Sequence, residues 1–315
     1  MRLSSHPHQP VLLEEAVRDL VSRPEGTYVD GTCGSGGHSE AIGRRLAPEG
    51  RLICLDRDPE AVAATRSRLG FMGDRARFFQ ANFADLDGVL EIVGLEAVSG
   101  VLLDLGLSSH QLEYSGRGFS FKRDEPLDMR MDREAGGESA WDLVNRSDER
   151  DLERMIRNYG EERYAGRIAR AIVRRRASEP VNTTGELAEL VSSVVKPSRR
   201  PAARHPATRT FQALRIAVNR ELENLEAFLE RIPERLERGG RLVVLSYHSL
   251  EDRRVKQAIR SWEKGCTCPR DFPVCTCGKS TLFKPLRREG LRPTEREIEQ
   301  NPRARSAVLR AAERL

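Results

Sequence analysis

The sequence predicts an α/β fold in which a Rossmann-like parallel sheet carries an inserted all-helical domain. Short apolar runs alternate with helical segments over the first third of the chain, and three of these runs end on an acid, at Asp30, Asp56 and Asp104. Such alternation is typical of a parallel sheet that binds ligands at the carboxyl ends of its strands. Between 109 and 207 no convincing buried strand follows, which indicates the helical insertion.

Hydrophobic spacing predicts the elements of the sheet domain in order. Apolar residues at helical spacing indicate a first helix over 12–21. Buried-type apolar runs predict four strands, at 27–30, 51–56, 76–80 and 98–105. Helices are expected between them at 39–46 and 59–69, the second with Pro59 in its first turn, where the missing N–H removes no helical hydrogen bond.

The second half of the chain is mostly helical. Within the insertion, helical patterns recur at 140–144, 149–159, 163–176 and 184–195. After it we expect one long helix over 208–238, a fifth strand over 241–246, a helix over 250–262, and an antiparallel edge hairpin of 281–286 with 306–312. The predicted domains are a sheet domain of residues 1–108 and 208–315 and an inserted domain of residues 109–207.

Length and charge narrow the class of protein. A chain of 315 residues has length for about two domains. It shows neither a membrane-length apolar run nor a secretory signal pattern, so we expect a soluble, cytoplasmic protein. The net charge of +5 and the pI near 9.0 are compatible with an acidic partner such as nucleic acid.

The insertion carries the basic bias of the chain. Arg167, Arg170 and Arg174 fall on one face of a predicted helix. A proline-broken loop continues the charge at Lys196, Arg199, Arg200, Arg204 and His205. A solvated helix face and a phosphate-binding surface both account for this pattern.

A glycine-rich loop, within TYVDGTCGSGGH (27–38), follows the first strand. Its glycines permit a tight turn and a close approach of backbone to a ligand, at Gly31, Gly34, Gly36 and Gly37. Asp30 at its entrance suits a cationic ligand, and Ser39 stands where a dinucleotide loop needs its third glycine. The spacing of acid and glycines resembles the S-adenosylmethionine loop of Rossmann-like methyltransferases, with Thr32 in place of the usual first glycine.

Asp56 adds a second indication of a nucleoside-type cofactor. It ends the second strand, and an acid at that position accepts hydrogen bonds from ribose hydroxyls. An ordinary turn with nothing bound explains the glycines alone, but it does not explain both features.

Long motifs throughout the chain resemble the bacterial 16S ribosomal RNA cytosine-N4-methyltransferase family. They include HQPVLLEEAV, YVDGTCGSGGHS, LLDLGLSSHQL, YGEERYAGRIARAI, HPATRTFQALRI and LSYHSLEDRRVK. The resemblance implies a class I methyltransferase sheet, an inserted helical RNA-substrate domain, and methyl transfer from S-adenosylmethionine to N4 of a decoding-region cytosine in the small ribosomal subunit. It also implies cofactor contacts at Gly36, Gly37, His38, Asp56, Phe83, Asp104 and Gln111.

The proposed chemistry needs an acceptor near the cytosine amino group, because the N4 lone pair is delocalised into the ring. Asp104 ends the fourth strand, where DNA amino-methyltransferases begin a motif with two prolines that is missing here. Asp104 is therefore a candidate for catalysis, for cofactor binding, or for both. Tyr247 and His248 follow the fifth strand, and His248 is the second catalytic candidate. Phe83 is expected beside the adenine or in the core, and Phe119 or Tyr247 against a flipped base.

Specific residues argue against other classes of function. A dehydrogenase needs the third loop glycine that Ser39 replaces, and a DNA amino-methyltransferase should carry the proline pair. A purely RNA-binding protein has no need of three acids at one sheet edge. An oligomer is compatible with the sequence.

Four cysteines gather near the carboxyl terminus, at Cys266, Cys268, Cys275 and Cys277. They are compatible with a structural zinc site remote from the cofactor, with a reduced thiol cluster, or with a redox-dependent disulfide pair.

Overall fold

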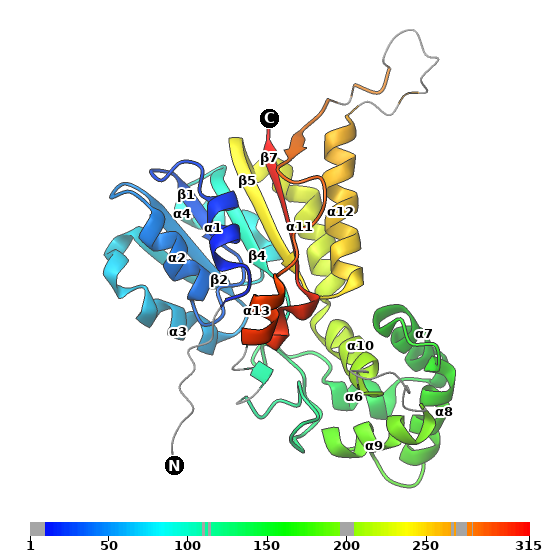
Figure 1. Cartoon of the computed structure of the whole chain (residues 1–315). Helices are drawn as coiled ribbons and strands as arrows, with labels where there is room; N and C mark the ends of the chain where they lie inside the picture. Colours follow the sequence, from blue (N-terminus) through cyan, green and yellow to red (C-terminus); the bar gives the residue numbers. More distant parts are fainter. Residues whose placement is uncertain are drawn as a thin grey trace. The chain divides into compact units, whose positions relative to one another are not determined.

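The computed structural model describes residues 10–108, 111–112, 115–195, 205–265, 268, 276–278 and 280–315. The chain divides into two compact units (Figure 1). Residues 1–106 and 223–315 form the sheet unit, and residues 107–222 form the helical unit. Among the described residues, no helix combines the length and the apolar character needed to span a membrane.

The sheet unit is built on seven strands in the order β3-β2-β1-β4-β5-β7-β6. The strands are β1 (Thr27–Asp30), β2 (Arg51–Asp56), β3 (Ala76–Gln80), β4 (Val98–Asp104), β5 (Leu236–Ser246), β6 (Phe283–Pro285) and β7 (Val308–Arg314). The first five are parallel, and β7 runs antiparallel between β5 and β6. The predicted Rossmann-like α/β sheet is confirmed. The two tail strands pair antiparallel as expected, but α13 (Glu295–Gln300) and η3 (Pro302–Ser306) separate them, so they form no tight hairpin.

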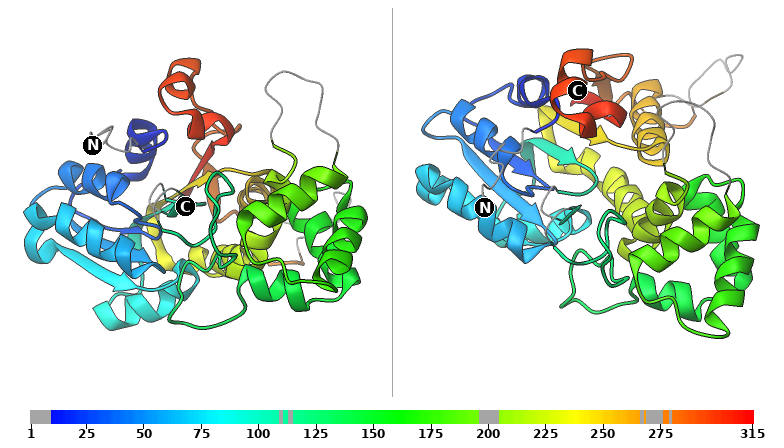
Figure 2. Two further views of the ribbon diagram at one scale, coloured as in Figure 1. Left: turned by 90° about the horizontal axis from the view of Figure 1, so that it is seen from below. Right: turned by 60° about the horizontal axis from the view of Figure 1, so that its bottom comes forward.

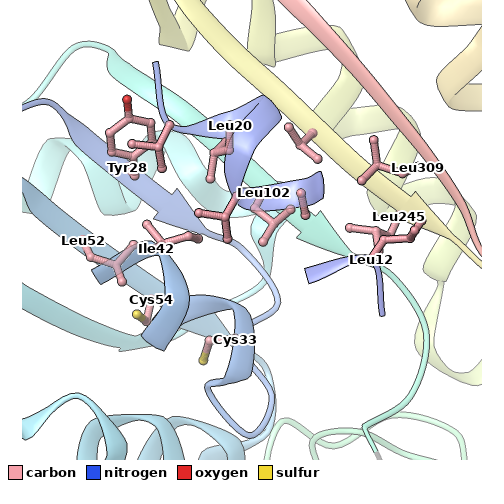
Figure 3. Close-up of a cluster of buried hydrophobic side chains, with 14 of the residues drawn as sticks. Leu12, Leu20, Tyr28, Cys33, Ile42, Leu52, Cys54, Leu102, Leu245 and Leu309 are labelled. Atoms are coloured by element: carbon pink, nitrogen blue, oxygen red, sulfur yellow. The ribbon is translucent and has the colours of Figure 1, made fainter. Parts of the chain in front are cut away.

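Helices cover both faces of the sheet because its strands are apolar on both sides. Val243 and Leu245 of β5 pack with α1 (Leu13–Leu20) and α2 (Gly37–Arg45), in the cluster drawn in Figure 3. Leu242 and Val244 face the other way, toward α4 (Leu86–Val93), α11 (Glu221–Arg235) and α12 (Ser249–Lys264). The helix α4 was not predicted. Next to β2 and β3 lies α3 (Pro59–Arg68), with Pro59 in its first turn as expected.

The helical unit has a hydrophobic core of its own. It contains α6 (Ala140–Arg146), α7 (Glu149–Gly160), α8 (Ala165–Arg176), α9 (Thr184–Val194) and α10 (Thr208–Asn219), green in Figure 2. Capping boxes begin α6 at Ser139 and α9 at Thr183, so the polar ends of these helices are satisfied locally. Apolar residues from all five helices then pack together.

The prediction of one long helix over 208–238 is wrong. Arg220 has a left-handed conformation, with φ of 50°, and it separates α10 from α11. The side chain of Asn219, at the end of α10, is held by residues distant in sequence: its amide donates to Met129 O at 2.8 Å, and its oxygen accepts from Met131 N–H at 2.9 Å. The division between the units falls at 222/223 instead of the expected 207/208, since Phe211 and Leu214 of α10 lie in the helical core.

Candidate functional site

The loop between β1 and α2 is held in a shape that requires glycine at two positions. A Cβ on Gly31 would lie 2.5 Å from Leu103 Cδ2, so the loop passes β4 only without a side chain there. Gly36 has φ of 80° immediately before α2, which glycine adopts without strain. Thr65 of α3 donates from its hydroxyl to Gly34 O at 3.0 Å. The result is a fixed turn of backbone beside the N–H groups that begin α2.

Asp56 ends β2 and directs its carboxylate into this loop. Oδ2 accepts from Gly34 N–H at 2.9 Å, and Oδ1 accepts from Asp58 N–H at 3.0 Å. Burial raises the pKa of Asp56 to about 6, although these two N–H groups oppose the rise. Each carboxylate oxygen has a further lone pair, so Asp56 can still accept from a ligand hydroxyl.

Asp104 ends β4 between β1 and β5 and has polar contacts with three other residues. Its N–H donates to Thr32 Oγ1 at 2.6 Å, and the Tyr247 hydroxyl donates to its Oδ1 at 2.7 Å. His38 Nδ1 lies 3.4 Å from Oδ2. The Asp104 side chain is still 22% exposed, which leaves its carboxylate accessible to a ligand. Thr32, which departs from the usual glycine, thus ties the loop to β4.

His38 lies in the first turn of α2 and is 5% exposed. Its Nε2 is 3.1 Å from Val11 O, and its Nδ1 faces Asp104. Burial by itself lowers the pKa of His38. The contact with Asp104 and the charges of Asp104 and Asp30 outweigh it, so that the pKa is raised. This arrangement favours the protonated imidazole next to the Asp104 carboxylate.

Asp30 supports the loop from beneath. It is 1% exposed, its Oδ2 accepts from Ser39 Oγ at 2.5 Å, and its Oδ1 accepts from Thr32 N–H at 3.2 Å. Burial raises the pKa of this carboxyl. Asp30 therefore stabilises the turn internally and does not face a cationic ligand as expected. Ser39, which stands where a dinucleotide loop needs a glycine, is the residue that donates this hydrogen bond to Asp30.

Phe83 follows β3 and packs partly into the core. Its ring meets the Phe228 ring edge-on, with centroids 5.7 Å apart and an interplanar angle of 89°. The ring remains half-buried and not fully enclosed. One side of Phe83 is thus a core contact, and its contact with a cofactor stays a prediction.

His248 caps α12. Its Nδ1 accepts from Glu251 N–H at 3.4 Å, and its Nε2 lies 3.1 Å from Glu251 Oε1. The Glu251 carboxylate in turn accepts from the N–H groups of Tyr247 and His248, at 2.8 and 3.3 Å. Nδ1 of His248 is thus used by the helix cap, whereas the buried Nε2 is close to Glu251 without a hydrogen bond among the described residues. The catalytic role of His248 stays a prediction without geometric support.

Gln111 belongs to the helical unit, whereas the other predicted cofactor residues belong to the sheet unit. It is 5% exposed, and its Oε1 accepts from Ser108 N–H at 3.0 Å. Phe119 is buried in the core of the same unit, which removes it as a stacking partner for a base. The loop residues Lys196, Arg199, Arg200 and Arg204 lie outside the described residues.

The cysteine cluster is described only in part. Cys266 and Cys275 lie outside the described residues. Cys268 and Cys277 are half-buried thiols, and Thr276 N–H donates to Cys268 Sγ at 3.4 Å. The zinc interpretation gains no support from these contacts.

The comparisons of sequence agree on one family over nearly the whole chain. A sequence model of the MraW methylase family matches residues 5–315. A ribosomal RNA small subunit methyltransferase H from Symbiobacterium thermophilum is 50% identical over 98% of this chain and 96% of its own, and one from Syntrophus aciditrophicus is 51% identical over 98% of each chain. A solved rRNA methylase from Streptococcus thermophilus aligns with 96% of this chain and 93% of its own at 13% identity and a TM-score of 0.41, too distant to add to the argument.

Proposed function

Because the chain belongs to the MraW methylase family, we propose that it transfers a methyl group from S-adenosylmethionine to N4 of a decoding-region cytosine in 16S ribosomal RNA. Full-length similarity to proteins called ribosomal RNA small subunit methyltransferase H supports this substrate. One observation carries the proposal: the glycine loop contacts Asp104 at one edge of the sheet, and the Asp104 carboxylate there is partly exposed.

The residues at this edge fit the cofactor. The turn at Gly31 and Gly36 leaves no room for side chains where backbone must approach a ligand, and the first turn of α2 offers N–H groups. S-adenosylmethionine, when bound, supplies a methyl group on a positively charged sulfonium. Asp56 accepts hydrogen bonds from the ribose hydroxyls in this proposal. The assigned contacts are Gly36, Gly37, His38, Asp56, Phe83, Asp104 and Gln111.

We assign to Asp104 the role of acceptor for the cytosine amino group, since its partly exposed carboxylate ends β4 beside the glycine loop. A carboxylate directed at the N4 hydrogens would localise the nitrogen lone pair and stabilise the positive charge that develops on N4 as the N–CH3 bond forms and the S–CH3 bond breaks. N4 must then release one proton to give the neutral product, and the carboxylate can accept it. In-line alignment of the two reactants supplies much of the remaining rate. His248 remains the second catalytic candidate, with α12 capping as its visible role.

The exposed face of α8 supports RNA as the substrate. Arg167, Arg170 and Arg174 are exposed, and none makes an ion pair within the described residues. Other arginines of the same unit are neutralised, among them Arg154 by Asp151 and Arg157 by Glu153. Unneutralised arginines on one helix face are suited to successive phosphates.

Methyl transfer to isolated ribosomal subunits tests the function. Labelled S-adenosylmethionine is incubated with small subunits that lack the modification, and in parallel with DNA, before nucleoside analysis. We expect N4-methylcytidine from the subunits at one cytosine and no label in DNA. Label in DNA would favour the amino-methyltransferase alternative, and no transfer to either would refute the proposed activity.

A further inference from the structure

The two oxygens of the Asp104 carboxylate face different side chains. Oδ1 accepts from the Tyr247 hydroxyl at 2.7 Å, and Oδ2 lies 3.4 Å from His38 Nδ1. One partner follows β5 and the other begins α2, so the carboxylate is fixed from two sides. Neither contact removes the further lone pair of each oxygen, through which a ligand N–H can still be accepted.

His38 has oxygen acceptors at both ring nitrogens. Val11 O, at 3.1 Å from Nε2, is a carbonyl and can only accept, and an ionised Asp104 carboxylate can only accept as well. A neutral imidazole carries one N–H and would turn a lone pair toward one of these oxygens. Both contacts are favourable only for the doubly protonated ring, which is a cation next to Asp104.

Tyr247 is itself held in place by its surroundings. Its backbone N–H donates to Glu251 Oε2 at 2.8 Å, and Glu251 is 3% exposed. The Tyr247 ring lies against Gly106, where a Cβ would come within 3.3 Å of ring Cδ2. The hydroxyl therefore meets Asp104 because the backbone, the ring and α12 together set its direction.

We propose that Tyr247 and His38 are positioning residues that keep the Asp104 carboxylate in one orientation and in its acceptor form for methyl transfer. This inference rests on the proposed function, and it replaces the expected stacking role of Tyr247 with a hydrogen-bonding role. Each residue acts through Asp104 and not on the substrate directly.

The charges around His38 and Tyr247 agree with their assignment as positioning residues. His38 faces Asp104 and Asp30, whereas Tyr247 faces Asp104, Glu251 and Glu297. Burial and these acids raise the pKa of Tyr247 well above its usual value, so the phenol keeps its proton and remains a donor. Burial opposes the charge of His38, but the two acids near it raise its pKa.

The variant Tyr247→Phe removes only the hydroxyl, and Tyr28→Phe is its matched control. Tyr28 is also buried, and its hydroxyl donates to Arg23 O at 2.9 Å at the amino end of β1, away from the loop. The readouts are the single-turnover rate at saturating cofactor as a function of pH, and the dissociation constant of the cofactor by calorimetry.

For Tyr247→Phe we expect a rate roughly tenfold lower, because a hydrogen bond to a charged group is removed. We also expect the loss to lie in this rate and not in the dissociation constant of the cofactor, since the hydroxyl acts through the orientation of the Asp104 carboxylate. Tyr28→Phe should keep the wild-type profile. Identical profiles for both variants would overturn the role of Tyr247, as would weaker cofactor binding with an unchanged rate at saturation.

Nitrogen-15 spectra of the histidines test His38 without substrate. In the wild-type protein we expect His38 to hold both ring protons to a higher pH than ordinary histidines do. In Asp104→Asn we expect His38 to lose one ring proton at a lower pH than it does in the wild-type protein. If His38 carries only one ring proton throughout the neutral pH range, its role as a positioning residue for Asp104 is overturned. This readout does not depend on activity, so an absence of cytosine methylation by the wild-type protein would refute the proposed function and leave the His38 result to be judged separately.

Discussion

A single carboxylate, Asp56, connects the strand edge, the loop and the proposed cofactor. Since burial raises the pKa of Asp56 to about 6, protons compete with ribose hydroxyls for its oxygens below that pH. We expect the cofactor dissociation constant to increase as the pH falls through about 6, by at most about tenfold per pH unit. Calorimetry between pH 5 and about 8 measures this change.

Two variants sharpen that measurement. Asp56→Asn should weaken binding at neutral pH, because hydrogen bonds to a charged acceptor are stronger than those to an amide, and should flatten the dependence on pH. Asp74→Asn, which changes an exposed acid of the same unit, should leave both unchanged. A pH dependence that persists in Asp56→Asn would mean that another group controls it.

The acids of the site were predictable from sequence, whereas their partners were not. Asp56 and Asp104 end apolar runs, and parallel strands bring such ends to one edge. The donors come from distant parts of the chain, as Tyr247 does for Asp104, and no local pattern encodes that pairing. Ser39 carried a usable signal, because a serine replaced an expected glycine and its hydroxyl meets Asp30.

At the scale of elements, the break between α10 and α11 stores local strain. Arg220 occupies a left-handed conformation that costs a residue with a Cβ about 1–2 kcal/mol. Arg220→Gly should therefore leave the free energy of unfolding unchanged or raise it by up to about 1 kcal/mol. Ala217→Gly, inside α10, should lower it by about 1 kcal/mol. Urea unfolding compares the two, and equal destabilisation would contradict the strained conformation at Arg220.

Hydrophobic periodicity did not reveal this break, because the apolar pattern continues from one helix into the next. At the end of α10, the side chain of Asn219 binds backbone groups of residues 129 and 131, far away in sequence. By contrast, α3 was predicted closely, since Pro59 signals its start within the segment itself, and the structure adds Asp58 as its N-cap.

The arginine face of α8 gives a second prediction at this scale. Changing Arg167, Arg170 and Arg174 together to alanine should weaken binding to ribosomal RNA. It should also reduce the salt dependence of that binding, by a slope of roughly 0.7–0.9 for each phosphate that the protein no longer neutralises. Cofactor affinity should not change. The control replaces three arginines that already have acid partners, Arg146, Arg154 and Arg157.

The salt slope decides the outcome for α8. The control removes the same charge, so equal slopes in the two triple variants would show that α8 is an ordinary solvated face. Arg199, Arg200 and Arg204 lie outside the described residues, and their contact with RNA stays a prediction for a third triple variant.

The whole molecule combines two units with separate hydrophobic cores. Charge, length and the loss of strand pattern after Asp104 predicted this organisation, but the second boundary was misplaced by the length of α10. That helix is amphipathic and could serve either core by pattern alone. Phe211 and Leu214 of this helix pack into the helical core, and such tertiary contacts cannot be read from the apolar pattern of the helix itself.

Separate cores predict a separate response to the cofactor. At a concentration 100 times its dissociation constant, a ligand adds about 2.7 kcal/mol to the stability of the unit that binds it. In hydrogen exchange we expect the slowest amides of β1 and β4 to slow further, by up to about 100-fold, on addition of the cofactor product. Amides of α7, α8 and α9 should change little, because the described residues of their core all belong to the helical unit. Gln111, the assigned cofactor contact in that unit, lies outside these three helices. Asp56→Ala at the same cofactor concentration should show little added protection, which ties the effect to the proposed site. Equal protection of both units would instead show that they unfold as one cooperative structure, and it would contradict the separate response of the two cores.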